Sequence, residues 1–272
     1  MKENNPGKLV FIGAGNMTEA MIRGTLKTGI YRKDDIIVTD IDPARLEHFE
    51  RELGIKGSRD NKQSASTAKI IVLAIKPQQA NAVIHELSGI LPDDILLISI
   101  VTGFSTKKIM AALGKPVRII RVVPNTPALV GSGASAYCCG KGTTDEDAHV
   151  VESILKSIGI AIKLEEPLMN AVTALSGSGP AYVFYMVEAL MKAGREIGLT
   201  EDDTRKLVIA TVTGSAHILL ETGIGHEELR QRVTSHGGTT EAAMEVLNKS
   251  GTQEAIIAAV KAAHKRAKEL SA

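Results

Sequence analysis

The sequence has no excess of charge of either sign. Its 32 lysine and arginine residues oppose 31 aspartate and glutamate residues, and the formal net charge is +1. No long basic block is present, and we interpret the cluster over 264–268 as the solvated face of a last helix. Proteins that bind nucleic acid present a basic patch or stripe, so we expect no nucleic-acid partner.

Long apolar runs are absent as well. The longest, such as residues 95–101, fall far short of the roughly 20 residues that a membrane-spanning helix needs. The segment before Leu9 is short and polar, without the pattern of a targeting signal. We therefore expect no membrane partner and a cytoplasmic location.

Cysteine is scarce, and the two that occur, Cys138 and Cys139, are adjacent within an apolar stretch that reads as a strand. Neighbouring strand residues point to opposite faces, so a mutual disulfide is not expected, and two ligands are too few for zinc. The seven histidines show no metal-ligand spacing, so no metal site is predicted. Two buried thiols in a reducing compartment are the favoured interpretation.

Apolar residues are plentiful, at 44%, and the chain is long enough to bury the cores of two ordinary domains. To about residue 165, short β-branched runs alternate with amphipathic segments, which predicts a parallel sheet with crossover helices. Strands are expected over 8–13, 36–40, 69–75, 95–99, 117–122, 134–139 and 160–164. Helices are expected between them over 16–28, 43–53, 77–90, 106–113 and 144–157.

After Pro167 the pattern becomes helical, with long helices expected over 180–197, 201–221 and 253–270 and no convincing strand. Segments such as 181–193 are apolar on more than one side, and a helix of that kind must be buried on most faces. A single layer of helices cannot provide this burial, so we expect a second subunit to cover them.

A glycine-rich turn, Gly13-Ala14-Gly15-Asn16-Met17, directly follows the first predicted strand. In dinucleotide-binding folds the first glycine permits a tight turn, the second admits the pyrophosphate, and the helix N-terminus supplies N–H donors. Thr18 replaces the usual third glycine, and Gly-x-Gly turns also occur in ordinary α/β loops. We predict a dinucleotide site formed here by Ile12, Gly13, Ala14, Gly15, Asn16 and Met17.

The predicted fold class is therefore α/β. A Rossmann-type parallel-sheet domain that binds the dinucleotide is expected over residues 1–165. An all-helical domain, which binds the substrate and forms the dimer, is expected over residues 166–272.

Asp40 ends the second predicted strand, where a carboxylate accepts hydrogen bonds from the adenine-ribose 2′- and 3′-hydroxyls. The same carboxylate would repel a 2′-phosphate, and isoleucine rather than arginine follows it, although Arg45 can still swing in. We therefore predict NADH or NADPH as cofactor, with NADH preferred. The alternative is that Asp40 only begins a turn and caps the next helix.

The segment Ala74-Ile75-Lys76-Pro77 closes the strand predicted over 69–75 at its carboxyl end, the edge where open α/β sheets bind ligands. An ordinary strand-end lysine and a first-turn proline would produce the same residues. Beside the glycine-rich turn, we interpret this backbone as the nicotinamide side of the site. Asn61 is a further expected cofactor contact.

Three more segments complete an ordered series with the glycine-rich turn and residues 74–77. They are Arg121-Val122-Val123-Pro124-Asn125-Thr126-Pro127, Leu175-Ser176-Gly177-Ser178-Gly179-Pro180-Ala181-Tyr182 and Val233-Thr234-Ser235-His236-Gly237-Gly238-Thr239-Thr240. Over nearly its whole length the chain resembles the pyrroline-5-carboxylate reductase family, and generic Rossmann enzymes have no reason to carry the last two segments. The resemblance implies an interlocked homodimer, often built into larger rings. It also implies NAD(P)H-dependent reduction of 1-pyrroline-5-carboxylate to L-proline, the final step of proline biosynthesis.

The chain departs from the family's usual residues in two places: His236 replaces a proline, and Gly225-His226 replaces His-Pro. Losing a proline loosens a turn, which predicts a more mobile loop or an altered substrate preference. His236 is not expected to donate a proton, because the family normally has proline there.

A cyclic imine needs a hydride on its carbon and a proton on its nitrogen, and its carboxylate is a handle for N–H donors. The Gly-Gly turn that opens a helix after residue 238 presents unpaired N–H groups to an anion. We predict that Thr240 makes the catalytic contact with the substrate nitrogen or carboxylate. Substrate binding is predicted for Ser235, Gly237, Gly238 and Thr239; the alternative is that the threonines only cap their helix.

Two further substrate contacts are expected. Ser178 lies in a segment of small residues that would let the next helix approach the nicotinamide and substrate, although packing alone also explains its glycines. Glu166 is carried over by alignment with the family, and the alternative is a solvated charge beside Glu165. No catalytic triad or carboxylate pair is recognisable, and hydride transfer to a protonated imine needs mainly positioning.

Two other functions stay open. One is a regulatory or redox-sensing paralogue that binds a dinucleotide without catalysis, which only His226 and His236 favour. The other is a reductase of another small cyclic imine or hydroxy acid. A hydroxy-acid enzyme would need a catalytic lysine, for which Lys192 is the candidate.

Overall fold

The computed structural model describes residues 7–271, which form two compact units. Unit 1 contains residues 7–178 and 263–271, and unit 2 contains residues 179–262. The predicted domain boundary at 165/166 stays a prediction. The two units are treated separately below.

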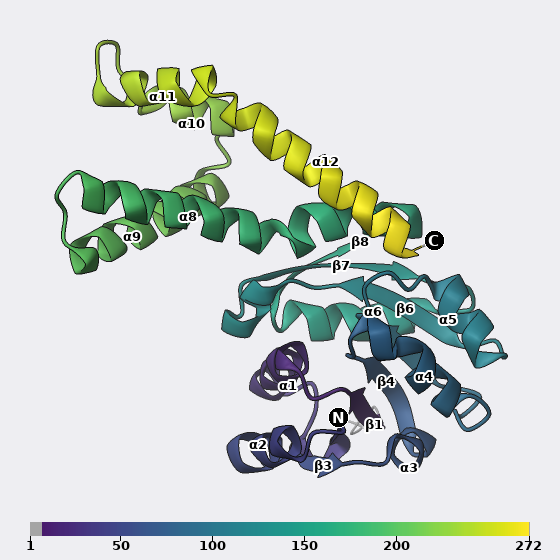
Figure 1. The fold of residues 1–272 in the computed structure, drawn as a ribbon. Coiled ribbons are helices and arrows are strands. Elements are labelled where there is room, and N and C mark those ends of the chain that lie inside the picture. Colours follow the sequence, from purple (N-terminus) through teal and green to yellow (C-terminus); the bar gives the residue numbers. More distant parts are fainter. Residues whose placement is uncertain (1–6, 272) are drawn as a thin grey trace. The chain divides into compact units, whose positions relative to one another are not determined.

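Unit 1 is built on one sheet, in which Figure 1 labels most of the strands. The strand order is β3-β2-β1-β4-β5-β6-β7-β8. The strands are β1 (Lys8–Ile12), β2 (Ile36–Thr39), β3 (Lys56–Ser58), β4 (Ala68–Leu73), β5 (Leu96–Ser99), β6 (Arg118–Val123), β7 (Gly133–Cys139) and β8 (Gly159–Lys163). The strand order reverses between β1 and β4, as in Rossmann dinucleotide-binding folds. The predicted strands are all present, whereas β3 was missed because Lys-Gly-Ser lacks a β-branched run.

One strand departs from the predicted parallel arrangement: β7 runs antiparallel to β6. The connection over residues 124–132 contains only a short 3-10 turn, Thr126–Val130. A parallel pair needs a crossover of roughly a dozen residues or more, so this connection permits only a return in the opposite direction. The sheet is otherwise parallel, including the β7 and β8 pair.

Helices cover both faces of this sheet. They are α1 (Asn16–Thr28), α2 (Pro43–Leu53), α3 (Asn61–Ser66), α4 (Pro77–Leu87), α5 (Thr106–Leu113) and α6 (Asp145–Lys156). Along β1, Leu9 and Phe11 enter one core with α1, α2 and α6, while Val10 and Ile12 enter the other with α3, α4 and α5. This alternation follows from the two-residue period of a strand. The helix α3 was not predicted, because a single turn and a half carries too little periodicity.

Residues 166–178 link the sheet to the helical half. They form a 3-10 turn (Glu166–Leu168), the short helix α7 (Met169–Val172) and a π-helical turn (Thr173–Gly177). Met169 is fully buried against the β7 residues Ala136 and Cys138.

Burial raises the pKa of the Cys138 thiol to about 12, so this cysteine stays protonated at neutral pH.

The remaining helices are α8 (Gly179–Glu196), α9 (Glu201–Thr222), α10 (His226–Arg232), α11 (Thr239–Lys249) and α12 (Thr252–Ser271), and α12 ends in unit 1. Large apolar side chains of α8 and α9 remain exposed, among them Tyr185 at 76% and Leu220 at 80%. An apolar surface of this kind marks an interaction site. Among the described helices, none has the length and apolar content required to span a bilayer.

Candidate functional site

A cavity of about 820 Å³ opens in unit 1 where β1 and β4 end. Its volume lies in the range typical of cofactor sites. The cavity is lined by the predicted cofactor residues Ile12, Gly13, Gly15, Asn16, Met17, Asp40, Asn61, Ala74, Ile75, Lys76 and Pro77. Of the predicted set, Ala14 is the exception, because this residue of the turn is fully buried.

The glycine-rich turn requires its first glycine. Gly13 has a φ of +105°, and a Cβ atom there would lie 2.4 Å from the carbonyl oxygen of Ala74. Gly15 is different, because it is exposed and a Cβ atom would meet nothing within 4 Å. The first glycine therefore lets β1 and β4 approach each other, while the second leaves space in front of the turn.

The start of α1 suits an anion. Gly15 is the N-cap and offers no side chain, so the first N–H groups of the helix have no side-chain partner. Thr18, in the usual place of the third glycine, is fully buried and donates its hydroxyl to the Gly13 carbonyl over 2.6 Å. Threonine at this position therefore adds a hydrogen bond that braces the turn.

Asp40 lies at the cavity with its carboxylate held from two sides. Its Oδ2 accepts the Ala14 N–H at 2.7 Å and its Oδ1 accepts the Asp42 N–H at 3.0 Å. The cap of α2 is Asp42, whose side chain accepts the Ala44 N–H, so the alternative role of Asp40 as the helix cap is wrong. Each carboxylate oxygen can accept another hydrogen bond, which leaves Asp40 able to receive ribose hydroxyls.

Asn61 begins α3 and lines the same cavity. It accepts the Thr39 hydroxyl at 2.6 Å and donates to Glu86 at 3.0 Å, which fixes the orientation of its amide. Sequence reasoning missed several other lining residues, namely Thr39, Ile41, Gln78, Gln79, Ala82, Val83, Ile100, Thr102, Thr126 and Leu129. Two of these residues could have been predicted from the sequence, because Ile100 and Thr126 follow the carboxyl ends of strands that share this edge.

Glu166, whose side chain is 30% exposed, belongs to a polar cluster of unit 1 that includes the buried residues Thr106 and Arg121. Its carboxylate accepts the Thr106 N–H at 2.7 Å and the Thr106 hydroxyl at 2.6 Å. Arg121, only 3% exposed, faces it at 3.7 Å and also donates to Asn170. Glu166 is therefore not a solvated surface charge, and it joins the start of α5 to β6; its substrate contact stays a prediction.

Replacing Glu166 separates these two roles. We expect E166Q to lower the free energy of unfolding by about 2 kcal/mol, because Arg121 then faces a neutral amide and one Thr106 donor loses its acceptor. The matched control is E165Q, an exposed neighbour whose side chain makes no capping bond. Urea unfolding and substrate KM are measured together, and a normal stability with a raised KM would instead assign the carboxylate to the substrate.

The segments 121–127 and 175–182 meet within unit 1 through Asn125 and Ser176. Asn125 donates to the Ser176 carbonyl at 3.2 Å and accepts the Ala134 N–H at 2.8 Å. Ser178 donates its hydroxyl to the Thr173 carbonyl at 3.1 Å, and the oxygen keeps its acceptor capacity. Asn125 thus ties the π-helical turn to β7.

The 235–240 loop lies in unit 2 and leads into α11. Gly238 is the N-cap, with no side chain to bond the first N–H groups, so the threonines do not cap this helix. Among residues 7–271, the hydroxyls of Thr239 and Thr240 have no hydrogen-bond partner. The first turn of α11 therefore combines free N–H donors with two unengaged hydroxyls, a set that suits a carboxylate or an imine nitrogen.

Glu241 closes this loop, which sequence reasoning missed. Its Oε2 accepts the Gly237 N–H at 2.7 Å, and its Oε1 lies 3.2 Å from Nδ1 of the exposed His236. A glutamate in the first turn that reaches back to the loop is a recognisable helix-start signal. Here it restrains the turn that contains His236. Ser235 accepts the Gly238 N–H through its carbonyl.

Lys192 is the lysine on which the hydroxy-acid alternative depends. Lys192 is an exposed residue of α8 whose ammonium lies 3.8 Å from Glu196, a solvent-facing pair. Between residues 7 and 271, no group of three or more His, Cys, Asp or Glu side chains could hold a metal ion.

Family models match both halves of the chain. Residues 166–270 match the model described as pyrroline-5-carboxylate reductase dimerisation, and residues 8–103 match the model described as NADP oxidoreductase, coenzyme F420-dependent. Pyrroline-5-carboxylate reductase 1 of Bacillus spizizenii is 36% identical over 265 residues, covering 97% of this chain and 89% of the relative.

Solved structures show the same likeness. A pyrroline-5-carboxylate reductase from Coxiella burnetii has a TM-score of 0.90 and 40% identity, covering 98% of this chain and all of its own. The Plasmodium falciparum pyrroline carboxylate reductase, solved with NADP bound, has a TM-score of 0.90 and 31% identity, with 98% of each chain covered.

Proposed function

The chain belongs to the pyrroline-5-carboxylate reductase family, and from this premise we propose how its own residues reduce 1-pyrroline-5-carboxylate to L-proline with a nicotinamide dinucleotide. The carrying observation is the cavity at the carboxyl ends of β1 and β4, lined by the glycine-rich turn and Asp40. The reaction completes proline biosynthesis. Its direct test is loss of reduced-nicotinamide absorbance with stoichiometric formation of proline.

The chain's contribution is binding and orientation. When bound, the reduced nicotinamide supplies the hydride that the imine carbon receives. Gly15 and the first turn of α1 receive the pyrophosphate, Asp40 receives the ribose hydroxyls, and residues 74–77 border the nicotinamide. Asn61 completes this set.

Thr240 is the proposed catalytic residue, with its hydroxyl directed to the substrate nitrogen or carboxylate. The N–H groups of Thr239 and Thr240 bind the carboxylate, supported by the Gly-Gly turn of residues 237 and 238. Ser235, Ser178 and Glu166 are proposed as further substrate contacts. Since a protonated imine is already electrophilic, holding it in place accounts for most of the acceleration.

Asp40 is proposed to make NADH the preferred cofactor. The catalytic efficiency with NADH is expected to exceed that with NADPH by about tenfold, because a carboxylate beside the 2′-position repels a phosphate. D40N keeps an acceptor for the Ala14 N–H but removes the charge, so the ratio should approach one.

The matched control for this test is D42N, since asparagine preserves the cap of α2 and Asp42 does not line the cavity. Steady-state kinetics with both cofactors measures each ratio. A wild-type enzyme with clearly better efficiency on NADPH would contradict the assignment of Asp40.

The functional enzyme is a homo-oligomer, as the dimerisation model over 166–270 and the exposed apolar side chains of α8 and α9 support. A homodimer is the smallest assembly we propose. We also propose a cytoplasmic location, since both cysteines are free thiols of the kind found in reducing compartments.

A further inference from the structure

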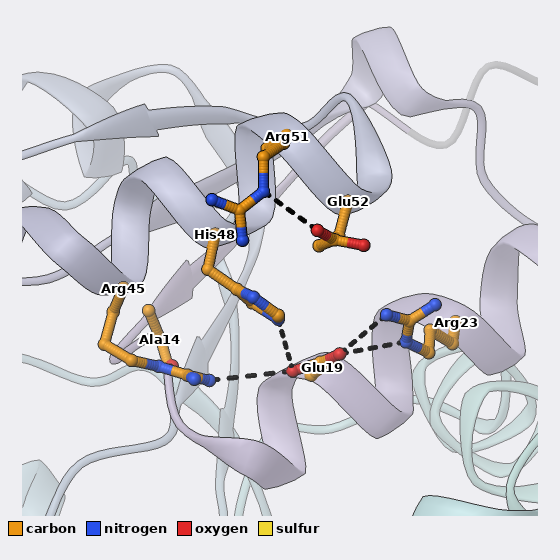
Figure 2. A network of polar contacts seen from close by, with 7 residues as sticks. All are labelled: Ala14, Glu19, Arg23, Arg45, His48, Arg51 and Glu52. Atoms are coloured by element: carbon orange, nitrogen blue, oxygen red, sulfur yellow. Dashed lines mark hydrogen bonds and ion pairs between the residues drawn. The ribbon is translucent and has the colours of Figure 1, made fainter.

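A polar network that the proposed function does not use lies behind the glycine-rich turn (Figure 2). It joins α1 to α2 through the side chains of Glu19 and Arg23 on one helix and Arg45 and His48 on the other. We call these four residues the Glu19 network. All of them lie in unit 1, and none lines the cavity.

The network reaches the turn through Ala14. Arg45 donates its Nε–H to the Ala14 carbonyl over 2.7 Å, and the Ala14 N–H is donated to Asp40 over 2.7 Å. One buried residue of the turn is therefore held at its N–H by Asp40 and at its carbonyl by Arg45. Ala14 is itself fully buried, so this clamp acts on the shape of the turn and not on a bound ligand.

Glu19 forms an ion pair with the guanidinium of Arg45. Its Oε2 lies 3.7 Å from Arg45 Nη2 and 3.0 Å from His48 Nε2, while its Oε1 accepts two hydrogen bonds from Arg23. The Arg45 guanidinium carbon also lies 5.7 Å from the centre of the Phe49 ring. Figure 2 shows the Arg45 and His48 side chains converging on Glu19.

The restraint leaves one donor of Arg45 unused. Its Nη2 is buried and has no hydrogen-bond partner among the described residues, although the ion pair with Glu19 is near. Burial acts to raise the pKa of Glu19, but hydrogen bonds from Arg23 and His48 outweigh it and hold that pKa below its ordinary value. The carboxylate is therefore ionised at neutral pH and attracts Arg45.

We propose that Arg45 is a positioning residue for the glycine-rich turn, and that Glu19 determines cofactor specificity by keeping the guanidinium away from the 2′-position beside Asp40. This rests on the proposed function, since it needs a nicotinamide dinucleotide in the cavity. Arg45 and Asp40 bond the carbonyl and the N–H of the same residue, Ala14. Arginine binds phosphate through paired N–H donors, so a released Arg45 would bind a 2′-phosphate beside Asp40. Glu19 thus lowers the affinity for NADPH through Arg45, without contacting the cofactor.

The test compares dissociation constants for NADH and NADPH, read from nicotinamide fluorescence, in five proteins: wild type, E19Q, R45M, the double variant E19Q/R45M and R23M. E19Q is expected to shift the affinity ratio about tenfold toward NADPH, because the guanidinium loses its ion pair, and to weaken NADH as R45M does, because a released Arg45 no longer donates to the Ala14 carbonyl. R45M should weaken both cofactors about fivefold, since the Ala14 carbonyl loses its donor. The double variant should show no gain for NADPH.

R23M is the matched control, because it removes a partner of Glu19 that contacts neither Ala14 nor Arg45. Its affinity ratio should match the wild type. Melting temperatures are recorded for every variant, and R45K, which can still donate to the Ala14 carbonyl, replaces R45M if the latter unfolds. With R45K, NADH binding should stay within about threefold of the wild type.

An unchanged ratio in E19Q, or a gain for NADPH that persists in E19Q/R45M, would overturn the proposal. The second result would assign the gain to the lost charge alone. Proline formation is measured separately with the wild type. Absence of turnover with normal dinucleotide binding would refute the proposed function while leaving the ratio test interpretable.

Discussion

G13A is expected to weaken the binding of NADH and NADPH by about 100-fold and to lower the melting temperature. Alanine at position 13 is strained because φ is +105°, and its Cβ atom would lie 2.4 Å from the Ala74 carbonyl oxygen. That oxygen is backbone at the end of β4 and cannot rotate away. The turn must therefore move away from β4, which distorts the cavity.

G15A is the matched comparison for this variant. Gly15 has a φ of −78° and a ψ of 177°, which alanine adopts without strain, and its Cβ would meet nothing within 4 Å. Its stability should match the wild type, while cofactor affinity falls about tenfold because the methyl group occupies the pyrophosphate's approach. Thermal melts and nicotinamide fluorescence separate the two effects. Normal NADH binding by G13A would place the dinucleotide elsewhere.

T240V is expected to reduce kcat/KM for 1-pyrroline-5-carboxylate by about 100-fold while leaving the dissociation constant of NADH unchanged. The Thr240 hydroxyl has no partner among the described residues, so its loss breaks no internal hydrogen bond and stability should be retained. The hydroxyl sits on the first turn of α11, where the N–H groups already favour an anion.

T240S provides the control, because serine keeps the hydroxyl and should retain activity within about fivefold. Both variants are assayed at saturating cofactor so that only substrate handling is compared. A T240V enzyme of nearly normal efficiency would transfer the catalytic contact to Thr239 or to the backbone donors of the loop. Restored activity in T240S with loss in T240V would assign the effect to the hydroxyl and not to helix stability.

The glycine-rich turn shows what local pattern makes predictable. A tight turn after a β-branched run admits few residue types at position 13, and the turn depends only on residues close to it in the chain. Asp40 and residues 74–77 were also predictable, because the carboxyl ends of neighbouring parallel strands meet at one edge whatever their side chains are. The predicted part of the cavity lining follows from these local rules combined with one topological rule, whereas residues such as Gln78 and Leu129 were missed.

Contacts between distant positions could not be predicted in the same way. Thr106 and Glu166 are 60 residues apart, and nothing in either segment indicates that the carboxylate joins the start of α5. Arg45 was open to the opposite interpretation, as a group free to meet a 2′-phosphate. Its bond to the Ala14 carbonyl depends on how α2 packs beside α1, which periodicity does not describe.

The sequence by itself determined the strands other than β3, the long helices, the position of the dinucleotide turn and the family, because each depends on short-range patterning or on residues contiguous in the chain. Only the tertiary structure decided that β7 turns back against β6, that Asp42 and not Asp40 caps α2, and that Glu19 restrains Arg45. The restraint of Arg45 arises from contacts between α1 and α2, whereas the other two outcomes depend on a local hydrogen bond and on the length of one connection. Local propensity does not specify which side chains form hydrogen bonds or ion pairs with one another.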